Sequence, residues 1–179
     1  MNIEKIFASL EELDIDCFEH LSGSLINHLK GTYLLLDSWG NDTDLCFAGL
    51  YHAVYGTSGF DKILISEKHR GKVKEILGEK SEQIVYTYCA CDRDFFWPQI
   101  GTKSNPLFLD RYKGEKYHLS LNELQMFCEL TIANELEIAK DNNAFINKYG
   151  PSLKDLFLRM QPYVSNQATS YAIQIFGEI

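Results

Sequence analysis

Apolar residues recur every three to four positions along most of the chain, which is the spacing of one face of an α-helix. The first stripe of this kind lies in residues 3–13. A second opens near Ser22 or Ser24 and ends at residues 39–41, where a glycine provides a natural stop. The pattern therefore predicts an all-α fold.

The same spacing predicts further helices, bounded by capping residues and by glycine or proline stops. Ser120 and Glu123 have the spacing of a capping box and predict the start of a long helix. The further helices are expected over residues 45–55, 66–77, 81–96, 120–140, 152–160 and 166–176.

The stretch over residues 97–119 breaks the helical pattern, because glycine and Asn-Pro or Lys-Gly pairs recur in it. Within it, residues 107–109 and 117–119 are expected to pair as a short hairpin. The sequence thus predicts one domain over residues 1–179. Its expected fold is a helical bundle with a short irregular or β-hairpin insertion around 97–119.

Composition and charge narrow the choice of partners. Net charge is −8 and the pI is near 5.1, so no basic face for a nucleic-acid backbone is expected. A small polar or anionic molecule stays open as a ligand. No apolar run reaches the roughly 18 residues of a membrane span, and no secretory signal is expected. Five cysteines in mostly apolar segments are typical of reduced, buried thiols in a cytoplasm.

Two histidines carry the most informative chemistry. His28 and His52 lie in apolar surroundings on successive predicted helices, an arrangement from which all-helical proteins assemble metal sites. Tyr51 and Tyr55 are four residues apart and are expected to line the same cavity as His52. An ordinary interpretation stays open, because a histidine among apolar residues is often a hydrogen-bonded core imidazole.

Arginines are the best candidates for binding an anion, because their planar guanidinium matches phosphate and carboxylate oxygens. Arg93 and Arg111 are such candidates, and so is the basic stretch 68–70. Scattered surface charges explain these residues equally well.

Several segments resemble HD-superfamily phosphohydrolases, particularly the guanosine-tetraphosphate hydrolase branch. Residues 45–57 resemble their "AALLHDVVEDT" segment, and residues 130–137 resemble the "KLADRLHN" helix that carries the last metal ligand. Residues 73–85 are similar to the helix pair between them. His28 and His52 fall at the two HD histidines. The chain also resembles an uncharacterised family of small bacterial proteins with an "HL-GT-LL-WG … AGL-H-YGT" pattern. Both resemblances imply the same helical fold.

The resemblance fails at the acidic residues. Ala53 replaces the aspartate that follows the second histidine, and Asn134 replaces the last ligand. Tyr55 and Gly56 replace the Glu-Asp pair thought to act on the attacking water. Neutral donors suit Zn²⁺ or Fe²⁺ better than Mn²⁺ or Mg²⁺. Two outcomes stay open: a divalent transition metal (Fe, Zn or Mn), or no metal. The expected metal ligands are His28, His52, His20 and Asn134.

Three functions compete, and the sequence leaves open whether the protein is an enzyme. In the first, a pocket binds a small polar molecule, with His52, His28 and Tyr55 as catalytic residues. Its other expected ligand-binding residues are Tyr51, Asn134, Arg93 and Arg111. In the second, the protein is a metal-dependent phosphohydrolase acting on a nucleotide or phosphoester. In the third, it is an interaction module or homodimer, with the aromatic stretch 95–98 as an exposed contact patch or as a plug over the core.

Overall fold

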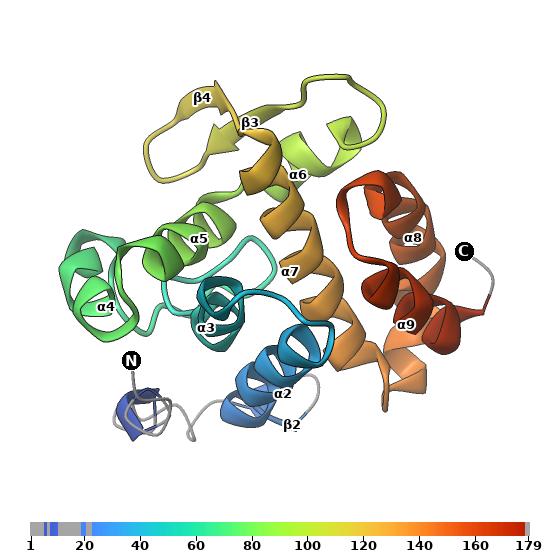
Figure 1. The fold of residues 1–179 in the computed structure, drawn as a ribbon, viewed down its shortest axis with the longest axis horizontal. Helices are drawn as coiled ribbons and strands as arrows, with labels where there is room; N and C mark the ends of the chain where they lie inside the picture. Colours follow the sequence, from blue (N-terminus) through green and yellow to red (C-terminus); the bar gives the residue numbers. More distant parts are fainter. Residues whose placement is uncertain (1–5, 7, 11–18, 21–22, 178–179) are drawn as a thin grey trace. The chain divides into compact units, whose positions relative to one another are not determined.

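The computed structural model describes residues 6, 8–10, 19–20 and 23–177, with residues 19, 20 and 23 described by their backbone alone. These residues are mainly helical, as the apolar spacing predicts (Figure 1). Two compact units follow each other along the chain: unit 1 is Met1–Cys89 and unit 2 is Ala90–Ile179. The prediction of one domain over the whole chain stays a prediction. Most of the helix predicted within residues 3–13 lies outside the described residues.

The described part of unit 1 consists of helices, a turn region over residues 52–66 and a small antiparallel pair of strands, in which Glu19 lies opposite Ser24. Helices α2 and α3 pack against each other. The described elements are β1 (Glu19–His20), β2 (Gly23–Ser24), α2 (Leu25–Ser38), α3 (Thr43–Tyr51), the 3-10 helix η2 (Glu67–His69), α4 (Arg70–Leu77) and α5 (Glu79–Ala90).

Capping side chains fix the starts of the two central helices. The Ser24 hydroxyl accepts a hydrogen bond from the backbone N–H of Asn27 and begins α2. The Asp42 carboxylate accepts one from Leu45 N–H at 2.8 Å and begins α3. These starts agree with the prediction, because serine and aspartate satisfy N–H groups that a helix leaves without internal partners.

Helix α3 ends at Tyr51, four residues before the predicted end. The His52 ring Nδ1 lies 2.7 Å from the Gly49 carbonyl oxygen. Beyond it the backbone continues in tight turns, with Val54 N–H bonded to Tyr51 O and Gly56 N–H bonded to Ala53 O. The helical path is therefore lost at His52.

The helix predicted over 81–96 is two helices, α5 and α6 (Arg93–Phe96). Cys91 forms an isolated antiparallel bridge with Asp110, and the Asp92 side chain accepts a hydrogen bond from Phe95 N–H to begin α6. A β-bridge and a new cap at adjacent residues interrupt the helix.

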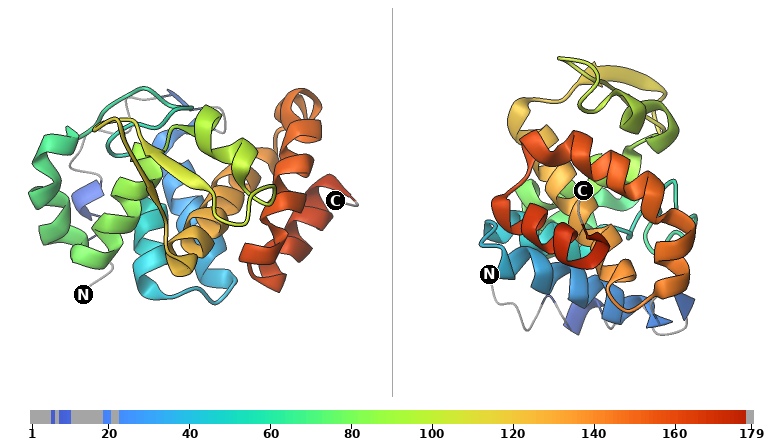
Figure 2. Two further views of the ribbon diagram at one scale, coloured as in Figure 1. Left: turned by 90° about the horizontal axis from the view of Figure 1, so that it is seen from above. Right: turned by 90° about the vertical axis from the view of Figure 1, so that its right-hand side faces the viewer.

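Unit 2 combines a hairpin with three long or medium helices (Figures 1 and 2). The predicted hairpin is confirmed: β3 pairs with β4 in antiparallel register, from Leu107 opposite His118 to Asp110 opposite Glu115. Besides α6, the elements are the 3-10 helix η3 (Trp97–Gln99), β3 (Leu107–Asp110), β4 (Glu115–His118), α7 (Leu121–Ala139), α8 (Asn143–Met160), the 3-10 helix η4 (Gln161–Tyr163) and α9 (Asn166–Phe176).

The predicted capping box at the start of α7 is confirmed, with the Ser120 hydroxyl and the Glu123 carboxylate each bonded to the other residue's backbone N–H. Helix α8 differs from the prediction, because it begins at Asn143 and contains Pro151. Its buried face runs through Phe145 and continues beyond the proline. Packing of that face outweighs the backbone hydrogen bond that proline cannot donate.

Aromatic rings form the core beneath the hairpin. The Phe96 ring meets the Phe108 ring edge-on at 5.1 Å and the Phe127 ring at 5.3 Å between centroids. Phe96 is fully buried. Of the two interpretations of residues 95–98, the plug over the core is therefore correct for Phe96.

The four described cysteines are buried and free of disulfides, as predicted. Burial raises the pKa of the Cys46 thiol to about 12, helped by the nearby Asp37 carboxylate. Burial also raises the pKa of Cys91 and Cys128. Among the described helices, none has the length and apolar character needed to cross a membrane.

Candidate functional site

Helix α2 positions His28 one turn after its serine cap, on the face that packs toward α3. The side chain is 1% exposed. One turn later, the Thr32 hydroxyl donates to the His28 carbonyl oxygen at 2.9 Å. The ring is thus held on a rigid, buried helix face.

Helix α3 positions His52 at its C-terminal cap, where the ring folds back onto the last turn. Because a carbonyl can only accept, the 2.7 Å contact to Gly49 O requires a proton on the His52 Nδ1. In the neutral ring, the His52 Nε2 then carries a lone pair. Gly49 also allows α2 to approach: a Cβ there would lie 2.6 Å from Leu36 Cδ1.

The two imidazoles meet inside unit 1. Their Nε2 atoms are 3.3 Å apart and their ring centroids 5.1 Å apart, with the ring planes at 81°. The prediction that His28 and His52 come together is confirmed by this contact, whereas their roles in binding, catalysis or metal ligation stay predictions. With both rings neutral, the His28 Nε2–H donates to the His52 Nε2, so a single proton lies between them.

The surroundings of His52 add further contacts. The Tyr88 ring meets the His52 ring edge-on at 5.6 Å between centroids. The Cys89 thiol donates to the His52 carbonyl oxygen at 3.0 Å. Both contacts come from α5, so three helices of unit 1 fix the position of this histidine.

The two tyrosines predicted to line the cavity with His52 point their hydroxyls to other partners. The Tyr51 hydroxyl lies 2.9 Å from the Ser9 hydroxyl, and the Tyr55 hydroxyl donates to the Glu82 carboxylate at 2.9 Å. The expectation of one shared helix face is wrong, because α3 ends at Tyr51. Their predicted roles in catalysis and ligand binding stay predictions.

Glu82, which the sequence did not single out, brings together Tyr55 and Arg70. It is fully buried, and Arg70 grips its carboxylate with two hydrogen bonds, from Nε at 2.6 Å and from Nη2 at 2.8 Å. The Arg70 guanidinium also lies over the Tyr86 ring, 3.7 Å from its centroid. Burial, followed by the hydrogen bond to Glu82, raises the pKa of Tyr55. Arg70 of the basic stretch 68–70 thus pairs with a carboxylate of the chain itself, and anion binding by this stretch stays a prediction.

Two predicted ligand-binding residues of unit 2 meet at Glu135. The Asn134 amide donates to the Glu135 carboxylate at 2.9 Å, and Arg93 Nη1 lies 3.4 Å from the same oxygen. Arg111 is elsewhere: it is exposed, and its guanidinium covers the Tyr112 ring and donates to the Tyr112 hydroxyl. Ligand binding by these residues stays a prediction.

The carboxylates near Asn134 on α7 are buried. Glu135 and Glu137 are 8% and 5% exposed. Glu129, on the same helix, accepts hydrogen bonds from the Ser165 backbone N–H at 2.8 Å and hydroxyl at 2.6 Å, which places a carboxylate at the start of α9. Charged residues on a buried helix are the signal that sequence reasoning missed.

The donor set around the histidine pair meets part of what a metal ion needs. Two Nε2 atoms at 3.3 Å match one edge of a tetrahedral zinc site, where Zn–N bonds of about 2.0–2.1 Å give an N···N distance of about 3.4 Å. His52 is also oriented through its second ring nitrogen, as metal-binding histidines are. Over the described residues, however, no three His, Cys, Asp or Glu side chains cluster as ligands. The donors described thus stop short of a complete metal site.

His20, the third predicted histidine ligand, lies on β1 and not on the helix of His28, which begins at Leu25. Its side chain lies outside the described residues.

Residues 9–93 match the sequence model of a family described as a domain of unknown function (DUF6817). The matched residues include α2, α3 and both histidines of the pair. No curated protein and no solved structure shows a significant match to the chain.

Proposed function

We propose that this chain is an HD-like protein whose functional centre is the His28–His52 pair, and that the pair binds a small anionic molecule together with a proton. The observation that carries the proposal is the 3.3 Å contact between two buried Nε2 atoms on successive helices. The family resemblance supports it, because these histidines stand at the two HD positions. The proposal includes no metal-dependent phosphohydrolysis, because Ala53 and Asn134 stand where that chemistry needs aspartates.

Proton uptake explains why an anion is the expected ligand. One proton suffices for the neutral pair, since one Nε2 donates and the other accepts. A second proton would turn both Nε2 atoms into donors facing each other, which is unfavourable in a buried site. An anionic oxygen beside the two rings relieves this conflict by accepting from both. Because imidazole exchanges protons near neutral pH, the same pair can return the proton to a bound group as a general acid.

The test is isothermal titration calorimetry with inorganic phosphate and with guanosine monophosphate. Wild-type protein is expected to take up a proton with each anion, measured by repeating the titration in buffers of different ionisation enthalpy. His28→Gln and His52→Gln are expected to weaken binding at least about tenfold, the loss of one charge-assisted hydrogen bond. His118→Gln is the matched control, because His118 is exposed and lies in unit 2.

Circular dichroism of each variant separates loss of binding from loss of fold. Equal affinities in wild type and in both pair variants would refute the proposal. So would anion binding without proton uptake.

Metal binding is the second candidate, favoured by the separation of the two Nε2 atoms. It predicts about one equivalent of a transition metal in freshly purified wild type and its loss in His52→Gln. Elemental analysis decides the matter. Less than about a tenth of an equivalent, with no rescue of phosphatase activity by added Mn²⁺, would exclude this candidate.

A further inference from the structure

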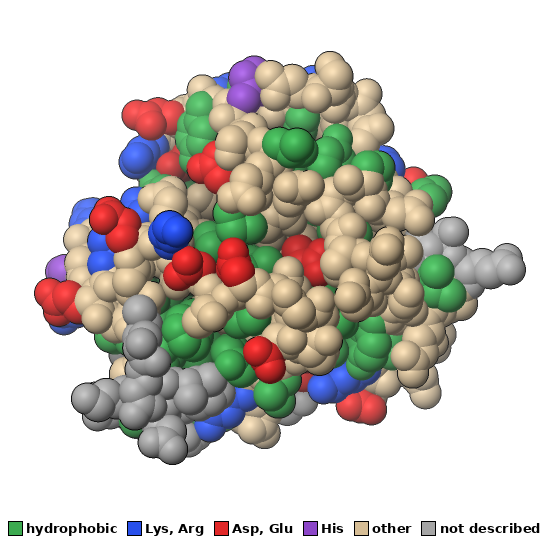
Figure 3. Space-filling view, in the orientation of Figure 1, with side chains coloured by type: hydrophobic (Ala, Val, Ile, Leu, Met, Phe, Trp, Pro, Cys, Tyr) green, Lys and Arg blue, Asp and Glu red, His purple; other side chains and the backbone are tan. Residues whose placement is uncertain are grey.

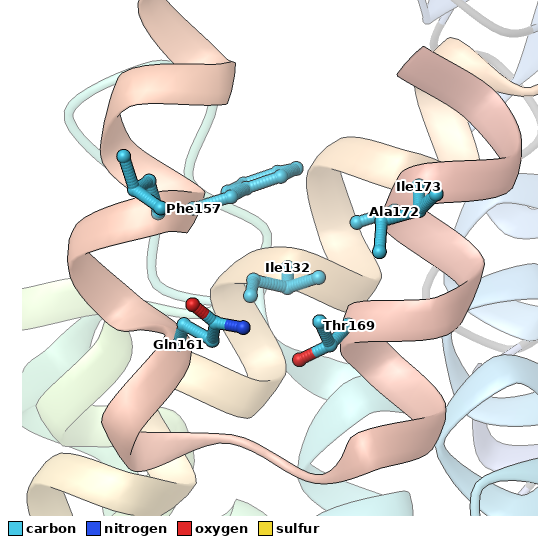
Figure 4. A pocket seen from close by; sticks show the side chains of 7 residues that line it. Ile132, Phe157, Gln161, Thr169, Ala172 and Ile173 are labelled. Carbon is cyan, nitrogen blue, oxygen red and sulfur yellow. The ribbon is translucent and has the colours of Figure 1, made fainter. Parts of the chain in front are cut away.

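A small pocket opens in unit 2 where α7, α8 and α9 meet (Figure 4). Its walls are mainly apolar, with one amide and one hydroxyl group. The lining residues are Ile132, Phe157, Leu158, Gln161, Thr169, Ala172 and Ile173.

The size of the pocket limits what it can hold. Its volume is about 30 Å³. Typical small-molecule sites measure roughly 300–1,000 Å³, so a metabolite does not fit. The space accommodates the tip of one aliphatic side chain. A protein surface is therefore the expected occupant.

The rim of the pocket presents apolar side chains of that kind. Leu158 on α8 is 52% exposed and Ile173 on α9 is 45% exposed, although both also line the pocket. The surface formed by α8 and α9, called here the α8–α9 face, thus carries both the pocket and apolar side chains that would fill such a pocket. Self-complementary faces of this type form two-fold symmetric contacts between identical chains.

The charge of this face points to the same partner. Residues 161–177 contain no Asp, Glu, Lys, Arg or His, although 23% of the whole chain is charged. In Figure 3 the surface over α8 and α9 is mainly tan and green. The nearby Arg159 donates to Asp155 on its own helix and to the carbonyl oxygen of Trp97.

The absence of charged residues over 161–177 matters in a chain of net charge −8, because two copies repel each other wherever their acidic surfaces meet. The cores of protein interfaces are also depleted in charged residues. A second copy of this chain therefore meets little repulsion over residues 161–177.

We propose that the protein forms a two-fold symmetric homodimer through the α8–α9 face, with Leu158 and Ile173 of each copy packing against the pocket of the other. This inference goes beyond the proposed function, since it involves none of the residues of the histidine pair.

Sedimentation equilibrium and light scattering test the dimer at concentrations up to about 100 µM, because interfaces of standard size dissociate in the micromolar range or below. Wild type is expected at twice the chain mass of 20.6 kDa. Ile173→Glu and Ile173→Lys are each expected at the monomer mass, because like charges then face each other. Mixing these two variants is expected to restore the dimer, since opposite charges then meet across the face.

Leu34→Glu is the matched control, because Leu34 is an equally apolar side chain, 59% exposed, on α2 of unit 1. It is expected to leave the dimer unchanged, and circular dichroism checks that all variants are folded. A wild-type monomer at about 100 µM would overturn the proposal. Dimers of Ile173→Glu as stable as wild type, or a dimer lost in Leu34→Glu, would overturn it as well.

Discussion

The hydroxyl of Tyr55 donates a hydrogen bond to the fully buried carboxylate of Glu82. This contact gives Tyr55 a structural role. Glu82 already receives two hydrogen bonds from Arg70, whose side chain is 22% exposed. A buried carboxylate is tolerated only when its oxygens are satisfied in this way. The three side chains therefore act together to hold α4, α5 and the turn after α3.

Replacing Tyr55 by phenylalanine is expected to lower the free energy of unfolding by about 1.5–3 kcal/mol, the usual contribution of a hydrogen bond to a charged group. Urea unfolding at neutral pH measures the change. Tyr112→Phe is the control, because its hydroxyl bonds to Arg111 at an exposed position, where little change is expected. An unchanged stability of Tyr55→Phe would contradict the assigned role.

The loss of stability in Tyr55→Phe is also expected to depend on pH. The folded-state pKa of Tyr55 lies above its ordinary value of 10.0, through burial first and the bond to Glu82 second. A raised pKa means that the phenol's contribution is complete below pH 10.0 and is lost as pH rises through the folded-state value. The stability difference between wild type and Tyr55→Phe should stay constant up to about pH 10.0 and narrow above it. A difference that widens there would contradict the sign.

Residue by residue, the sequence predicts contacts that follow from successive helices and misses those that depend on how a loop folds. His28 and His52 could be predicted to meet, because two apolar helices joined by a short loop pack face to face. Glu82 could not be paired with Arg70, because a 3-10 turn and the positive φ of Gly78 decide which faces of α4 and α5 meet.

Among the elements, the close packing of α2 on α3 depends on the missing side chain of Gly49. A methyl group there would lie 2.6 Å from Leu36 Cδ1 and 3.5 Å from Thr32 Cγ2. Leu36 is fully buried and has little room to move. Either the buried Leu36 side chain must change its position or the two helices, and with them the histidine pair, must separate.

Gly49→Ala is therefore expected to destabilise the protein by about 1–3 kcal/mol, the usual cost of overpacking a core. Gly71→Ala provides the opposite case, because Gly71 lies within α4 and nothing lies within 4 Å of the added methyl. It should stabilise by about 0.5–1 kcal/mol, as alanine does over glycine inside a helix. Chemical denaturation of both variants checks the pair. A Gly49→Ala protein as stable as wild type would contradict the packing argument.

Helix starts with a capping side chain at α2, α3 and α7 were predictable, whereas the end of α3 and the start of α8 were not. Ser24, Asp42 and Ser120 each satisfy N–H groups of the next turn, a local interaction that sequence reveals. The end of α3 depends on the ring of His52 binding Gly49 O, and α8 continues through Pro151 because its apolar face is buried. Tertiary packing decides both outcomes, and it leaves no local signal in the sequence.

For the whole molecule, acidity is the property with the widest consequence. A net charge of −8 opposes association with a polyanion. Fluorescence anisotropy with a labelled DNA duplex at about 0.15 M salt is expected to show no binding in the micromolar range. A dissociation constant below about 10 µM would contradict this expectation, since that is the range of non-specific DNA-binding proteins.

The burial of Cys46, Cys91 and Cys128 has a consequence for the oxidation of their thiols during storage. Oxidants and alkylating reagents attack the thiolate, and raised pKa values keep these sulfurs protonated. Damage must therefore wait until the surrounding helices open. The oxidation of these thiols therefore depends on how often the surrounding helices open locally.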